Sequence, residues 1–173
     1  IPYTAPIVVK LLDRGIEVID ELEFAYRFTE GKIIAITGTN GKTTTTLLTY
    51  HLLKEAGLNV GLGGNVGKSM AAQLIDKDYE WWVLEVSSFQ IDGFKDFKPD
   101  VVCDIRDFWM LEFADRSPFR DFFKWCIMPT VDARPQARQW IATYASADAC
   151  FTYSDWAGDV LQDQSGGKIN YLG

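Results

Sequence analysis

The sequence predicts an α/β fold with three layers, in which helices cover both faces of a doubly wound, mostly parallel sheet of about six strands. Two observations predict it. Apolar runs of strand length recur at residues 32–37, 81–86 and 101–105, and segments with helical spacing of apolar residues separate them. A loop rich in glycine follows the first of these runs. Strands and helices that alternate in this way are typical of P-loop and Rossmann-like domains.

The composition and length exclude several classes of function. The chain has 173 residues, enough for one α/β domain, with a net charge of −7 and a pI of about 4.7. The negative charge argues against nucleic acid or an anionic membrane as partner, so an anionic ligand needs a local site. Three widely spaced cysteines and the single histidine, His51, form no metal-binding pattern. The cysteine usage favours a reducing compartment, and we expect a cytoplasmic protein without a membrane span.

The first 30 residues lead into the glycine-rich loop. We expect a helix over residues 5–14, a short strand over 15–19 and a second helix that Asp20 caps. This segment contains no residue pattern that indicates chemistry of its own.

A phosphate-binding loop is predicted between the strand at 32–37 and a helix at 42–56. The loop reads Gly38, Thr39, Asn40, Gly41, Lys42, Thr43 and Thr44. Backbone N–H groups of the turn and of the helix N-terminus can hold an anion, and Lys42 can neutralise it. The hydroxyl of Thr43 can reach a magnesium ion on the phosphates. Position 36 is isoleucine where the general P-loop pattern has glycine, so this loop is a shortened form.

Two further polar residues follow predicted strands. Asn65 lies in a glycine-rich loop between a strand at 59–63 and a helix at 69–75. Glycines there let a ligand approach the backbone closely, although an ordinary turn explains them equally well. Glu85 ends the apolar strand at 81–86, where a buried carboxylate needs a partner. A magnesium ion on a nucleotide would supply that partner, and emergence of Glu85 into solvent is the alternative.

The character of the chain changes after Ile105. Residues 106–128 are rich in aromatic residues interleaved with charges, and we expect a core helix there, with a lid or a partner-binding helix as alternatives. A helix over 132–145, a strand over 149–153, a helix that Ser154 or Asp155 caps, and a strand over 168–172 complete the prediction.

Three motifs, at residues 38–44, 63–67 and 84–91, together resemble the Mur ligases. The sequence Ser-Ser-Phe-Gln at 87–90 is similar to the member of that family that adds D-glutamate to UDP-MurNAc-L-Ala. The resemblance covers residues 1 to about 105. It implies that residues 38–44 bind ATP, that Lys42 and Glu85 are catalytic, and that Thr43 and Glu85 hold Mg²⁺. It also implies that Asn65 and Ser87 lie toward a UDP-sugar substrate.

The chain also departs from the Mur ligases. Residues 104–109 replace a stretch in which that family has a metal-positioning histidine, and no counterpart of the family's modified lysine is found. Residues 147–173 weakly resemble the N-terminal Rossmann-like domain of GT-B glycosyltransferases. We interpret residues 1–173 as one α/β domain, a recombined or engineered chimera of a Mur ligase part, 1–105, and a glycosyltransferase-like part, 106–173.

Three hypotheses for function follow from these observations. The chain is an ATP–Mg²⁺-binding domain derived from a peptidoglycan-precursor ligase, without the complete ligase activity. Alternatively, it is a working ADP-forming amide ligase, or a chimeric or designed fold that binds no ligand.

Overall fold

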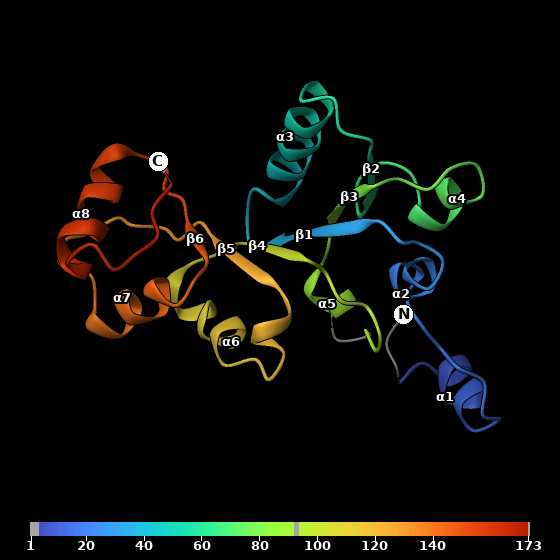
Figure 1. Cartoon of the computed structure of the whole chain (residues 1–173). Coiled ribbons are helices and arrows are strands. Elements are labelled where there is room, and N and C mark those ends of the chain that lie inside the picture. The colour runs from blue at the N-terminus through green and yellow to red at the C-terminus, as the bar shows by residue number, and fades with distance from the viewer. Residues whose placement is uncertain (1–3, 92–93, 173) are drawn as a thin grey trace.

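The computed structural model describes residues 4–91 and 94–172, and its centre is one sheet of six parallel strands (Figure 1). The strands are β1 (Lys32–Gly38), β2 (Val60–Gly64), β3 (Trp81–Glu85), β4 (Val101–Ile105), β5 (Lys124–Ile127) and β6 (Ala149–Cys150). Every pair of neighbouring strands in the sheet is parallel. The predicted fold class is therefore confirmed.

The strand order is β2-β3-β1-β4-β5-β6, which places β1 between β3 and β4. The chain runs from β1 outward to β2, returns to β3, and then crosses β1 to reach β4. A sheet of this kind opens a crevice at the carboxyl ends of the strands where the connections change direction. The register aligns Ile36 with Glu85 on one side of β1 and Gly38 with Ile105 on the other side.

The helices form the two outer layers. Helix α3 (Lys42–Glu55) covers one face of β1, β2 and β3. Helices α2 (Glu21–Tyr26), α4 (Met70–Leu74) and α5 (Ser88–Ile91) lie on the opposite face. Helices α6 (Glu112–Asp115), α7 (Arg138–Ala145) and α8 (Asp155–Ser165) gather at the β5–β6 end, and α1 (Pro6–Leu12) lies apart from the sheet (Figure 1).

Burial on both faces explains the apolar strands. Ile33 and Ala35 of β1 pack toward α2 and α4, whereas Ile34 and Ile36 pack toward α3. Because helices cover both faces of the sheet, side chains on either face of β1 are buried. Successive apolar residues therefore stabilise this strand, and apolar and polar residues do not alternate along it. Trp82 and Trp125, both fully buried, are the largest side chains of the two cores on the side opposite α3.

Four predicted elements differ from the structure. Residues 15–19 form no strand, because no neighbouring strand hydrogen-bonds to them, and Glu17 instead binds Arg27. The helix predicted over 132–145 begins only at Arg138, since Pro135 lacks an N–H group and disfavours a helix before it. The strand predicted over 149–153 is shortened to β6, and 168–172 contributes one isolated bridge, between Cys150 and Tyr171.

The core helix expected over residues 106–128 is also wrong. This segment contains two short 3₁₀ turns, Phe108–Met110 and Arg120–Phe122, the four-residue α6, and strand β5. Pro118 interrupts any helix there, and the fully buried Trp125 and Ile127 alternate with less buried neighbours in a strand pattern. In the described ranges, none of the helices combines the length and apolar character that crossing a membrane requires.

Candidate functional site

The loop between β1 and α3 lies at the carboxyl edge of the sheet and packs against the end of β4. Gly38 has a φ of 142°, and a Cβ atom there would lie 2.2 Å from the carbonyl oxygen of Ile105. The backbone N–H of Thr39 donates to that same oxygen at 3.0 Å. Gly41, with a φ of 79°, makes the second turn of the loop. These two positions require glycine, so the sequence pattern reflects the path of the backbone.

The loop places the N-terminus of the long helix α3 and the ammonium group of Lys42 close together. Helix α3 has 14 residues, and its N-cap residue, Gly41, has no side chain to bind the first N–H groups. The Lys42 ammonium folds back over the loop, where Nζ donates to the carbonyl oxygens of Gly38 at 2.9 Å and Thr39 at 3.2 Å. Asn40 and Thr44 are exposed at the margin of the loop. The positive end of the helix and an ammonium group therefore face the same space, which suits an anion.

Glu85 meets the loop from the neighbouring strand. The hydroxyl of Thr43 donates to Oε2 of Glu85 at 2.8 Å, although the two residues are 42 positions apart. Glu85 is 6% exposed. None of the ion pairs found among the described residues includes this carboxylate. A buried carboxylate beside a hydroxyl supplies oxygen ligands of the kind that Mg²⁺ prefers, so the residues fit the ion that the sequence predicts.

Asn65 joins this edge through the backbone. Gly64 has a φ of 87°, and a Cβ atom there would lie 2.1 Å from the carbonyl oxygen of Glu85. The N–H of Asn65 donates to that oxygen at 2.9 Å, and its side chain is exposed. The structure thus brings Asn65, Glu85 and Thr43 together at the carboxyl ends of β2, β3 and β1.

Ser87 makes different contacts. Its N–H and its hydroxyl both donate to Oε1 of Gln90, at 3.0 and 3.1 Å, and its Oγ accepts from the N–H of Gln90 at 3.3 Å. Gln90 also reaches the carboxylate of Asp20 at 3.4 Å. These bonds cap the short helix α5 and hold it near α2. A role of Ser87 toward substrate stays a prediction.

One group at this edge was missed by the sequence analysis. Arg106, just after β4, forms an ion pair with the buried Asp104 and donates from a terminal nitrogen to Oγ1 of Thr37 at 3.2 Å. Burial raises the pKa of the Asp104 carboxyl above its usual value, although the Arg106 guanidinium opposes the change. The sequence does contain a signal for this pair. Asp104 and Arg106 carry opposite charges two positions apart at the end of a buried strand, and alternate residues of a strand share one face.

Comparison with known proteins identifies the class of domain to which this site is similar. Residues 36–103 match the Mur ligase middle domain. The particular relatives are UDP-N-acetylmuramoylalanine--D-glutamate ligases. The enzyme of Bacteroides fragilis is 52% identical over 101 residues, and that of Cytophaga hutchinsonii is 55% identical over 103 residues. Each match covers 58% of this chain and 23% of the relative.

The predicted resemblance to Mur ligases is confirmed for about the first 100 residues. The chain spans about a quarter, 23%, of the length of these curated relatives. Among solved structures, MurF ligase from Thermotoga maritima in complex with ADP aligns with a TM-score of 0.42 and 22% identity. That alignment covers 87% of this chain and 34% of the other. The chimeric origin of residues 106–173 stays a prediction.

Proposed function

We propose that the chain binds ATP together with Mg²⁺ at the loop of residues 38–44. The hydrogen bond from Thr43 to Glu85 carries this proposal, because it joins the residue after the loop lysine to a buried carboxylate on the neighbouring strand. A nucleotide's phosphates need a cradle of N–H groups and a cation, and Mg²⁺ needs oxygen ligands. The loop, Lys42 and the Thr43–Glu85 pair offer all of these within one short region.

Each residue then has a definite task. Lys42 leaves the carbonyl oxygens of Gly38 and Thr39 and donates to phosphate oxygens, where a charge-assisted hydrogen bond is stronger. Thr43 and Glu85 supply oxygens to the metal ion. When bound, Mg²⁺ would offset the negative charge on the phosphates. The positive φ values of Gly38 and Gly41 give the loop the tight path that would carry its backbone N–H groups around the phosphates.

The proposed ancestry is a peptidoglycan-precursor ligase that adds D-glutamate to UDP-MurNAc-L-Ala with ATP. The identity with D-glutamate ligases over about 100 residues supports it. We propose that this chain binds the nucleotide without completing the ligase reaction, because residues 104–109 replace the stretch in which the Mur ligases have a metal-positioning histidine. Asn65 and Ser87 would then face a UDP-sugar, as the family resemblance implies.

Titration of ATP in the presence and absence of Mg²⁺ tests the proposal. Lys42→Ala should weaken ATP binding about tenfold to a hundredfold, since a charge-assisted hydrogen bond contributes about 1.5–3 kcal/mol. Glu85→Gln should remove most of the gain in affinity that Mg²⁺ gives. Lys54→Ala, a change of the same type at the other end of α3, is the matched control and should leave binding unchanged.

Two outcomes would contradict the proposal in different ways. Equal affinity of the wild type and Lys42→Ala for ATP, or no thermal shift with any nucleotide, would favour a fold without ligand function. Phosphate release that depends on both UDP-MurNAc-L-Ala and D-glutamate would instead show a working amide ligase, and the proposed loss of activity would be wrong.

A further inference from the structure

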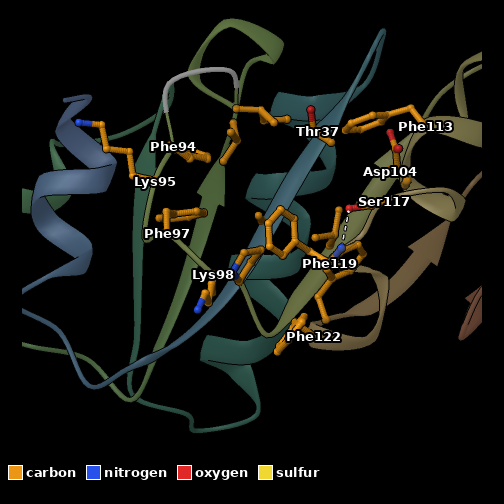
Figure 2. A pocket seen from close by; sticks show the side chains of 17 residues that line it. Thr37, Phe94, Lys95, Phe97, Lys98, Asp104, Phe113, Ser117, Phe119 and Phe122 are labelled. Carbon is orange, nitrogen blue, oxygen red and sulfur yellow. Dashed lines mark hydrogen bonds between the residues drawn. The ribbon is translucent and has the colours of Figure 1, made fainter. Parts of the chain in front are cut away.

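A separate cavity lies on the sheet face opposite α3. It has a volume of about 310 Å³, and β1 and β4 form its floor (Figure 2). Its walls come from residues 94–99, which follow α5, and from residues 113–123, around α6 and the second 3₁₀ turn. None of the loop residues 38–44 lines it. The cavity therefore excludes the phosphate-binding loop, and it meets the edge of the sheet that carries the loop only at Thr37 and Asp104.

The interior of the cavity is apolar. Its floor includes the buried side chains of Ala35 and Val86, and one wall holds the stacked rings of Phe94 and Phe97, with centroids 4.2 Å apart. Its one buried charge, Asp104, is paired with Arg106. Among the described residues, the cavity therefore has no buried unpaired charge that would need water or a counterion inside it.

Aromatic rings surround the opening. Phe113, Phe119 and Phe122 line the cavity, yet their exposed fractions are 58%, 61% and 66%. Figure 2 shows Phe119 and Phe122 beside Lys98 on one side of the cavity, with Phe113 at the other end. Covering solvent-exposed apolar surface around a cavity with an apolar ligand lowers the free energy, so this opening favours an apolar ligand.

Two lysines add positive charge to this apolar opening. Lys95 is bound to Glu17, with 3.2 Å between Nζ and the carboxylate. Nζ of Lys98 lies 5.9 Å from the ring centroid of Phe122, and Lys98 has no carboxylate partner among the residues that the structure describes. An exposed ammonium next to a phenyl-lined cavity is complementary to a ligand with one anionic end and an apolar body.

We propose that this cavity binds a free fatty acid of medium chain length. The hydrocarbon chain occupies the phenylalanine-lined interior, and the carboxylate lies at the opening beside Lys98. A volume of about 310 Å³ is at the lower end of the usual range for ligand pockets, which suits one short apolar chain and excludes a bulky lipid. No nucleotide takes part, so this proposal stands or falls independently of the proposed function.

Calorimetric titration with decanoate and with decanol, which has the same chain without the charge, tests the proposal. The wild type should bind decanoate about threefold to fivefold more tightly than decanol, as an exposed ion pair allows, and added salt should remove the difference. Lys98→Met should bind the two ligands equally. Lys54→Met, on the opposite side of the sheet, is the matched control and should retain the preference.

A second variant tests the position of the ligand. Ser117 lines the cavity near its opening and is only partly buried, so Ser117→Trp fills the opening with little disturbance of the core. It should abolish binding of both ligands while keeping the wild-type circular dichroism spectrum. The proposal is overturned if decanoate does not bind the wild type, if Lys98→Met keeps the preference for decanoate, or if a folded Ser117→Trp variant binds as the wild type does.

Discussion

Glu23 provides a test of how the wall of the cavity is held in place. This carboxylate on α2 is fully buried, and it accepts backbone N–H bonds from Lys95 at 2.9 Å, from Asp96 at 3.1 Å and from Phe97 at 3.0 Å. Arg27 lies 3.5 Å from Oε1 of Glu23, the same oxygen that accepts from Asp96. One side chain thus satisfies three consecutive N–H groups that no secondary structure pairs.

Glu23→Ala removes all three acceptors. Each unpaired N–H costs about 1 kcal/mol or more, so the free energy of unfolding should fall by about 3–4 kcal/mol. Glu23→Gln keeps one carbonyl oxygen for these donors and should cost about half as much. Urea denaturation at pH 7 measures both. A loss below about 0.5 kcal/mol in Glu23→Ala would refute the reasoning, because the N–H groups would then be satisfied without this carboxylate.

The same residue makes stability depend on pH. Burial alone would raise the pKa of Glu23, but the backbone N–H groups of residues 95–97 stabilise the charged form and lower the pKa below its usual value. A lowered pKa in the folded state stabilises the protein above the pKa of the unfolded chain, about 4.3, and this stabilisation is lost as pH falls through the folded value. The wild type should therefore lose stability on acidification below about pH 4 more steeply than Glu23→Gln.

Three further changes have outcomes that the structure determines. Gly38→Ala places a Cβ atom 2.2 Å from the carbonyl oxygen of Ile105, so it should lower the free energy of unfolding by at least about 2 kcal/mol and abolish ATP binding. Gly57→Ala is the control, because its Cβ atom would meet nothing within 4 Å, and thermal denaturation should show a loss of about 1 kcal/mol. Burial opposes ionisation of Asp148, but a backbone N–H and two cations lower its pKa to about 2. The wild type should therefore lose stability between about pH 4 and pH 2, and Asp148→Asn should lose less over the same range in an acid titration. The buried hydroxyl of Tyr144 has no hydrogen-bond partner within the described residues. Tyr144→Phe should therefore have a urea midpoint equal to that of the wild type or higher. A loss of more than about 1 kcal/mol in the free energy of unfolding would contradict this prediction.

The sequence predicts the first half of the fold well because its signals are local. Strands β1, β3 and β4 were predicted from mainly apolar runs of strand length, which burial between two helical layers favours. The loop at residues 38–44 was recognised because φ values of 142° at Gly38 and 79° at Gly41 demand glycine wherever the rest of the chain lies. Glu85 stood out as a charge that ends a buried strand.

The second half depends on partners that the sequence does not reveal. Strand β5 has only four residues, and its alternating Trp125 and Ile127 were obscured by the aromatic residues before them. The pairing of Arg106 with Thr37 needs the parallel alignment of β4 beside β1, which no local pattern encodes. Prediction fails in these cases because the stabilising contacts join residues that are far apart along the chain.

The pairing of β4 with β5 has a consequence for the part of the chain that matches the Mur ligases. That part ends at residue 103, on β4, yet β4 hydrogen-bonds to β5 from Val101 opposite Lys124 to Asp104 opposite Ile127. The second half of the chain therefore covers one edge of the first half. A fragment cut after Ile105 would expose a row of free N–H and C=O groups beside an apolar strand, a template for pairing with other molecules. The part that matches the Mur ligases thus depends on the remaining residues for protection against aggregation.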